Sequence, residues 1–248
     1  MTKEERVKEY RSRGIIQVPF EEMDKHQVFL EKQLALIRSV QPKPRPWHYW
    51  ELHNPWSRSA LVTDSWGFLD LCESKELTAI LTPLAGPDLI LYDSQFSPDL
   101  AERGHSSPLW TSDGERCPVD PLAGIVVRIP LASEEERGIS YSSENGEATT
   151  STGETLQILP GHLVCHDIRL RYQKQSPYDE YVIRYFPATS RYIRELTAPI
   201  HLQLTESFPL LNYARMPLWL VCGEDRANND FVTGFNPKAA RWIGQTNE

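Results

Sequence analysis

The sequence lacks the features that place a protein in a membrane or direct it out of the cell. No apolar run approaches the length of about 18 residues that a bilayer-spanning helix needs. The chain opens on charge, from Met1 to Arg6, and no apolar segment follows as it would in a secretion signal. We therefore expect a cytoplasmic protein that makes no membrane contact.

Basic blocks and closely spaced cysteines are also missing. The formal net charge is −8, from 26 Lys and Arg against 34 Asp and Glu, and an acidic chain has no electrostatic attraction for nucleic acid. The four cysteines, at positions 72, 117, 165 and 222, show none of the short spacings of a disulfide framework or a zinc site. We expect free thiols in a reducing compartment and no nucleic-acid partner.

What is present is the composition of an ordinary folded domain. A chain of 248 residues with 40% hydrophobic and 24% charged residues suits one β-rich domain. Thr2 and Glu5 form a capping box for a first helix that Gly14 ends, and apolar residues recur at helical spacing further on. The predicted helices cover residues 3–13, 21–40, 67–74 and 75–84, with a short strand at 15–18 between the first two.

Alternating apolar and polar residues predict strands in the second part of the chain. Residues 154–187 contain two such patterns, over 164–170 and 181–185, joined by a turn at Ser176-Pro177. Further predicted elements are strands at 88–96, 124–131 and 138–141, a helix near 206–213, an extended run at 217–221, and a tail docked through Phe231, Phe235 and Trp242.

Residues 41–57, QPKPRPWHYWELHNPWS, form an aromatic segment. Four of the seven tryptophans lie between residues 47 and 66. Such amphipathic aromatic surface is typical of a lid over a pocket, of a contact surface for another chain, or of satellite core. His48, Glu51 and His53 follow the spacing H-x-x-E-x-H but lack the helical register of zinc-binding helices, so we expect no metal site there.

Two further motifs resemble a known family. The segment GHLVCHDIRLRY, residues 161–172, has a glycine followed by an Arg-Leu pair, and WTSD, residues 110–113, has a Trp and an Asp ahead of an apolar strand. They resemble the G-D-L-L-x-F-H-x-R-L-x-H and W-H-x-D patterns of phytanoyl-CoA dioxygenase-like proteins, which use Fe(II) and 2-oxoglutarate. The resemblance implies a mainly β fold with N-terminal helices, a double-stranded β-helix barrel of the jelly-roll or cupin type.

The family holds its iron with two histidines and one carboxylate, and only the carboxylate matches. The three corresponding positions here are Thr111, Asp113 and Tyr172. A Thr hydroxyl is a poor donor to Fe(II), and Tyr could ligate only as a phenolate, from an unperturbed pKa of about 10. The resemblance therefore implies a degenerate iron site, and we expect neither metal nor cofactor.

The expected 2-oxoglutarate site also departs from the family. The resemblance places an arginine that clamps the co-substrate near Asp179 or Glu180, where carboxylates stand instead. Arg184 is the rescue candidate, although it also suits a solvent-facing place on its strand. By position, the pocket candidates are Tyr92, Gln95, His166 and Arg184.

The resemblance covers most of the chain and predicts a single domain over residues 1–248. A helical N-terminal region at 1–87 would contain the aromatic segment, barrel strands would occupy 88–187, and residues 188–248 would dock at the C-terminal end.

Three functions fit these observations. The first is a pseudoenzyme: a non-catalytic subunit that stabilises an active oxygenase of the same fold as a heterodimer, or self-associates, in small-molecule natural product metabolism. The second is an iron-independent isomerase or cyclase that binds a small-molecule ligand and uses Asp113, Tyr172 and His166 for proton transfer. The third is an active Fe(II)/2-oxoglutarate hydroxylase with atypical ligands such as His105, Asp113 and His166.

Overall fold

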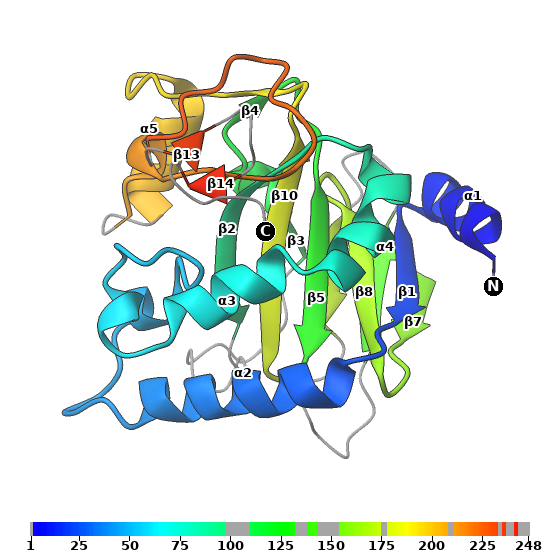
Figure 1. The fold of residues 1–248 in the computed structure, drawn as a ribbon, viewed down its shortest axis with the longest axis horizontal. Coiled ribbons are helices and arrows are strands. Elements are labelled where there is room, and N and C mark those ends of the chain that lie inside the picture. The colour runs from blue at the N-terminus through cyan, green and yellow to red at the C-terminus, as the bar shows by residue number, and fades with distance from the viewer. Residues whose placement is uncertain are drawn as a thin grey trace.

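A six-stranded antiparallel sheet is the main layer of the molecule (Figure 1). The computed structural model describes residues 2–97, 110–131, 138–142, 154–174, 178–207, 211–232, 235–236 and 241–242. In spatial order the strands are β1 (Ile15–Pro19), β8 (His162–Asp167), β5 (Ile125–Pro130), β10 (Glu180–Pro187), β2 (Leu89–Ser97) and β12 (Trp219–Cys222). Strands β1 and β12 come from outside the range 88–187 in which barrel strands were expected.

A smaller four-stranded sheet faces this layer. Its strands, in spatial order, are β3 (Thr111–Ser112), β9 (Arg171–Lys174), β6 (Gly138–Ser142) and β7 (Glu154–Gln157). Lys174 of the smaller sheet forms an ion pair with Glu180 of the main sheet, so the two inner faces meet. The protein is thus a mainly β, double-stranded β-helix with N-terminal helices, as predicted.

Helices cover the outer face of the main sheet (Figure 1). Alternate residues of β5, such as Ile125 and Val127, share one apolar core with Phe68 and with the buried sides of the helices. The helices are α1 (Lys3–Arg13), α2 (Met23–Arg38), α3 (Ser65–Cys72), α4 (Lys75–Ala85) and α5 (Pro199–Ser207), with 3-10 turns η1 (Pro46–Tyr49), η2 (Ser59–Leu61), η4 (Asp113–Arg116) and η5 (Tyr213–Arg215). The outer face of the sheet is therefore used for packing, and the charged side chains of β5 and β10 point to the inner face.

The N-terminal helix follows its sequence signals closely. Thr2 Oγ1 accepts a hydrogen bond from the Glu5 backbone N–H, and the Glu5 carboxylate accepts one from the Thr2 N–H. Gly14, at φ 70°, ends the helix in the left-handed conformation that glycine adopts without strain. The other three predicted N-terminal helices are confirmed within a few residues.

The prediction of two strands in residues 154–187 is wrong, because four strands lie there. The pattern over 164–170 stops at Asp167, whose carboxylate accepts a hydrogen bond from the Arg169 N–H at 2.8 Å. The Leu170 N–H then donates to the Asp167 carbonyl at 3.0 Å. An Asp side chain that bonds two residues ahead favours a turn, so the chain reverses between β8 and β9.

The predicted helix near 206–213 is also wrong. The helix α5 begins earlier, at Pro199, because proline suits the first turn of a helix. Pro209, by contrast, would lie inside a helix drawn over 206–213 and would remove one of its hydrogen bonds. The extended run near 217–221 is confirmed as β12.

Two short pairs of strands complete the fold. Phe231 is buried, as predicted for a docked tail. The pairs are β4 (Val119–Asp120) with β11 (Arg191–Tyr192), and β13 (Phe235–Asn236) with β14 (Arg241–Trp242). The side chains of Phe235 and Trp242 lie outside the described part of the chain.

All four cysteines are free, as predicted. Within the described ranges, no helix has both the length and the apolar character needed to cross a bilayer. The predicted turn at Ser176-Pro177 lies outside the described residues.

Candidate functional site

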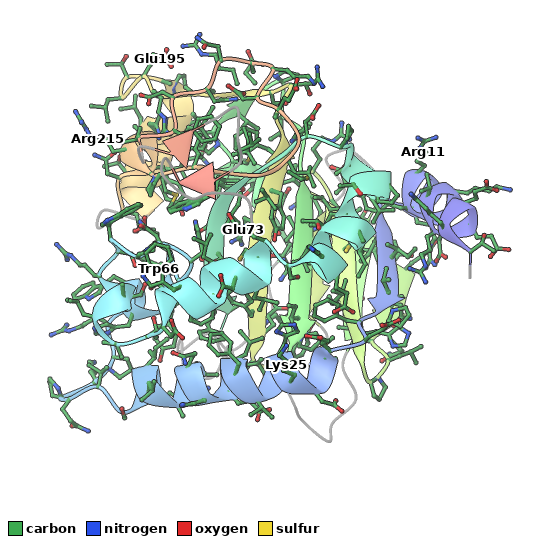
Figure 2. The ribbon with its side chains drawn as sticks, in the orientation of Figure 1. Arg11, Lys25, Trp66, Glu73, Glu195 and Arg215 are labelled. Atoms are coloured by element: carbon green, nitrogen blue, oxygen red, sulfur yellow. The ribbon has the colours of Figure 1, made fainter. Side chains whose placement is uncertain are left out.

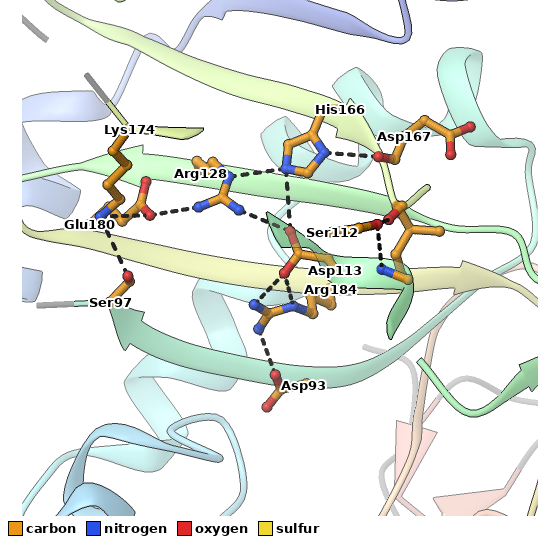
Figure 3. A network of polar contacts seen from close by, with 12 residues as sticks. Asp93, Ser97, Ser112, Asp113, Arg128, His166, Asp167, Lys174, Glu180 and Arg184 are labelled. Atoms are coloured by element: carbon orange, nitrogen blue, oxygen red, sulfur yellow. Dashed lines mark hydrogen bonds and ion pairs between the residues drawn. The ribbon is translucent and has the colours of Figure 1, made fainter. Parts of the chain in front are cut away.

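A network of charged side chains fills the space between the two sheets (Figure 3). Strand alternation turns Glu180 and Arg184 of β10 and Arg128 of β5 toward the inner face. Asp93 joins them because the register of β2 against β10 shifts beside Arg184, leaving Tyr92 as an extra residue. Such a bulge re-aims the side chains that follow it.

Asp113 is the centre of this network. Its Oδ1 accepts hydrogen bonds from Nε of Arg184 at 2.8 Å and from a terminal nitrogen of the same guanidinium at 2.5 Å. Its Oδ2 accepts one from Arg128 at 2.9 Å. Asp113 is 2% exposed, so two arginines saturate a carboxylate that has no solvent around it.

His166 lies beside Asp113, but its ring nitrogens already have partners. Nε2 accepts a hydrogen bond from Nε of Arg128 at 3.0 Å, which leaves the proton on Nδ1, 2.9 Å from the Asp167 carbonyl oxygen. The distance from His166 Nε2 to Asp113 Oδ2 is 3.6 Å. The histidine is thus a neutral acceptor for an arginine.

The two ends of the network are closed by further ion pairs. At one end Arg184 binds Asp93 at 2.6 Å. At the other, Glu180 accepts from Arg128 at 2.6 Å and lies 2.9 Å from the Lys174 ammonium. Three carboxylates, of Asp93, Asp113 and Glu180, therefore balance three cations, of Arg128, Lys174 and Arg184.

Burial and charge together set the protonation states. Burial by itself would raise the pKa of Asp113, but Arg184 and Arg128 outweigh it and hold that pKa well below its usual range. Burial and the Arg128 charge lower the pKa of His166 to about 4. Burial also raises the pKa of Tyr172 to about 12. Near neutral pH, none of these groups can exchange a proton easily.

Thr111 and Tyr172 lie directly opposite each other, as partners in the pairing of β3 with β9. Asp113 follows two residues after Thr111, so the structure brings together the three residues that the resemblance assigns to the iron motif. The Tyr172 ring, however, packs against Arg128, whose guanidinium carbon is 3.9 Å from the ring centroid. The tyrosine stacks on a cation instead of offering its oxygen to a metal.

These residues do not fit an iron ion. Fe(II) would need lone pairs of Asp113 and His166 that four arginine nitrogens already occupy, and it would lie between two guanidinium charges. In the described part of the chain, one group holds three metal-type ligand atoms together, namely Glu22, His26 and Glu76. It lies on the helical layer, where Lys25 already binds Glu22.

The predicted solvent-facing place for Arg184 is wrong. Its side chain is 3% exposed and bonds to Asp113 and Asp93, because β10 lies between two other strands and is covered on both faces. Tyr92 is fully buried among apolar residues with Phe186 and Tyr192.

The other site predictions divide between the network and its surroundings. His166 lies in the network, whereas Gln95 lies opposite Trp50 at an isolated β-bridge. His105 lies outside the described residues. Glu180 faces the interior where the resemblance placed a co-substrate arginine, and it is bound by Arg128 and Lys174.

Sequence reasoning missed Arg128, Lys174 and Asp93. A signal for Arg128 was present, because it is the one charge in the apolar strand IVVRIP, where a charged residue must find a buried partner. No comparable signal marked Asp93, since the bulge that turns it inward depends on how β2 pairs with β10.

The comparisons with known proteins agree with this architecture. No family model matches the chain, and no curated protein matches it significantly. Solved structures, by contrast, align with most of the chain. The structure "Non-heme monooxygenase, ThoJ-Ni complex" aligns with 94% of this chain and 87% of its own at 14% identity and a TM-score of 0.60. "CytC3 with Fe(II) and alpha-ketoglutarate" covers 97% and 96% at 15% identity and a TM-score of 0.60.

A third match is the non-heme alpha ketoglutarate dependent epimerase SnoN from nogalamycin biosynthesis. The alignment covers 80% of this chain and 88% of SnoN, at 16% identity and a TM-score of 0.58. The chain has the fold of the non-heme iron oxygenases. At these identities the likeness concerns the fold alone, so the function depends on the residues between the sheets.

Asp113 is expected to be the most sensitive position of the network. Asp113→Asn removes the charge that Arg128 and Arg184 share and leaves two buried cations short of a partner, so we expect a loss of about 3–5 kcal/mol in the free energy of unfolding. Asp120→Asn, at an exposed position, should change it by less than about 0.5 kcal/mol. Urea unfolding measures the free energy of unfolding of both variants. A loss in Asp113→Asn as small as that in Asp120→Asn would contradict the role given to Asp113.

Stability should fall on acidification partly through His166. Below its ordinary pKa of 6.5 the unfolded chain binds a proton that the folded chain takes up only near pH 4, so folded stability is lost as pH falls through this window. His166 contributes roughly 3 kcal/mol to this loss in the free energy of unfolding. His166→Gln should keep an acceptor for Arg128 and remove this contribution, and urea titrations between pH 7 and 4 measure it; an unchanged pH dependence in this variant would contradict the role given to His166.

Proposed function

We propose that this protein is a non-catalytic member of the oxygenase fold group, a partner subunit that stabilises an active Fe(II)/2-oxoglutarate oxygenase of the same fold. One observation carries the proposal: both carboxylate oxygens of Asp113 are bound by Arg128 and Arg184. A scaffold that has replaced its metal by a balanced set of ion pairs keeps its shape without the cofactor. Such a scaffold can serve assembly while another subunit performs the chemistry.

The alternative of an iron-independent isomerase or cyclase at the same position has less support. Proton transfer near pH 7 needs groups whose pKa lies near that value. The pKa of Asp113 is far below it, that of His166 is about 4 and that of Tyr172 is about 12. All three side chains are buried and engaged, so a substrate would have to displace the arginines first.

An active hydroxylase with atypical ligands meets a different obstacle. Asp113 and His166 do lie close together, as that hypothesis requires. Their lone pairs point at Arg128 and Arg184, however, and an arginine cannot be deprotonated in a protein to make room for a cation. The metal would therefore compete with two permanent positive charges.

The contact surface for the partner would be the aromatic part of residues 47–66. Trp56 is 56% exposed, Leu61 is 87% exposed and Trp66 is 52% exposed, and Trp66 lies at the outer end of α3 (Figure 2). Large apolar side chains at the surface are typical of protein contacts, where tryptophan is enriched. A role in natural product metabolism is suggested by SnoN, whose structure is described as coming from nogalamycin biosynthesis.

The iron site can be tested directly. We expect that anaerobic titration of the purified protein with Fe(II) and 2-oxoglutarate gives no visible charge-transfer band, because the guanidinium groups keep the metal from Asp113. CytC3, whose structure contains Fe(II) and alpha-ketoglutarate, is the positive control. A band for this protein under the conditions that saturate CytC3 would overturn the proposal.

The partner role predicts a stoichiometric complex. Used as bait in an extract of its source cells, the protein should retain an oxygenase of the same fold, and the complex should convert 2-oxoglutarate in an iron-dependent manner. Leu61→Ser with Trp66→Ser should lose the partner, whereas Val28→Ser, at a 68% exposed position on α2, should retain it. A chain that captures no oxygenase, or a complex insensitive to the double substitution, would argue against this surface.

A further inference from the structure

A cavity of about 390 Å³ lies outside the network, between the aromatic segment and the C-terminal part of the chain. This volume falls within the range of pockets that hold small organic molecules. Its walls come from residues 47–58 on one side and from residues 211–217 with Val232 on the other. None of the residues predicted for the iron or 2-oxoglutarate sites lines it.

Aromatic and apolar groups form much of the wall. Trp56 stacks on the buried Trp219 ring, with ring centroids 6.1 Å apart and planes inclined by 20°. Trp47, Met216 and Pro217 line the same space. Because Trp219 is fully buried, it holds Trp56 in place, and the cavity offers a supported flat surface to a ring.

Two arginines give this cavity a local positive charge in an acidic protein. Arg58 and Arg215 both line it, and neither forms an ion pair with a carboxylate in the described ranges. The Arg58 guanidinium carbon is 5.5 Å from the Trp47 ring centroid, so the tryptophan orients this side chain. Guanidinium groups without a carboxylate partner are suited to bind a carboxylate from a ligand.

Glu51 is the only acidic group among the lining residues. Its φ of 51° is rare for a residue with a side chain, and Val232 across the cavity has a φ of 59°. Glu51 keeps this conformation because the next residue, Leu52, donates its N–H to the Ser94 carbonyl at 3.1 Å. The Glu51 carboxyl accepts a hydrogen bond from Asn54 at 3.2 Å. Strained backbone of this kind persists where surrounding structure fixes it, often at ligand sites.

We infer that this cavity binds a small organic anion with a flat ring body, whose carboxylate faces Arg58 and Arg215 and whose ring lies against the tryptophans. The inference does not depend on the state of the buried network, with which the cavity shares no lining residue, and Trp56 belongs both to the cavity and to the proposed contact surface.

Three naphthalene probes with one ring system and different charge test this inference. By calorimetry at low salt, 2-naphthoate should bind at least about tenfold more tightly than 2-naphthalenemethanol, and 2-naphthylmethylammonium should bind no better than the alcohol. Trp56→Ala should weaken all three, since the ring surface is common to them. Equal binding of acid and alcohol, or no binding of any probe, would overturn the inference.

Arginine variants locate the charge recognition. Arg58→Gln with Arg215→Gln should abolish the preference for 2-naphthoate over the alcohol and leave alcohol binding intact. The matched control is Arg11→Gln, an exposed arginine on α1 at the opposite end of the molecule from Arg215 (Figure 2). A similar loss of preference in Arg11→Gln would show that net charge alone governs binding and would refute the site.

A pH series gives an independent readout. Burial raises the pKa of Glu51 to about 7. The hydrogen bond from Asn54 lowers this pKa in part, and the nearby Asp93 charge raises it. The groups that act on Glu51 are Asn54 of its own segment, Asp93 of β2 and Tyr213 of η5, and Arg58 and Arg215 line the same cavity. As pH rises through 7, Glu51 gains negative charge, so 2-naphthoate should bind more weakly at pH 8 than at pH 6. Glu51→Gln should remove this dependence, and an unchanged slope in that variant would contradict the placement of the anion.

Discussion

The ion pairs of Asp113 with Arg128 and Arg184 are the constraint on which the interior of this barrel depends. The carboxylate comes from the turn after β3, and the two guanidinium groups come from β5 and β10, so the contact joins the smaller sheet to the main one. Charges in such a dry space are tolerated only when each has a partner. The remaining members, Asp93, Glu180 and Lys174, complete the balance.

The same ion pairs occupy the atoms that an iron ion would need in the space between the sheets. An iron site requires free lone pairs that converge on an open position. Here the converging groups are occupied by donors that carry permanent positive charge, and Tyr172 lies over one of them. The charged groups of the interior therefore bind one another, and the cavity of about 390 Å³ lies apart from them, where residues 47–58 meet residues 211–217.

Much of the fold could be predicted because its signals are local. The capping box of Thr2 and Glu5 and the glycine at position 14 determine one helix by bonds within a few residues. The alternation along residues 181–185 is the period of a strand, and the apolar run at 124–131 is typical of a strand buried on both faces. The prediction failed at Asp167, where a side-chain bond to the Arg169 N–H turned an apparently continuous strand into two. It failed again at the C-terminal helix, where Pro199 and Pro209 carried more information than the apolar pattern.

The sequence by itself determined the fold class and the N-terminal helices, since each of these depends on residue identity or on short spacing. The tertiary structure decided which charged side chains meet between the two sheets. Arg128, Arg184 and Asp113 are separated by up to 71 positions in the chain, and only the pairing of strands, with the bulge in β2, brings their charges within hydrogen-bonding distance. Pairwise electrostatics depends on distance in space, so the composition of such a network cannot be predicted from neighbouring residues alone.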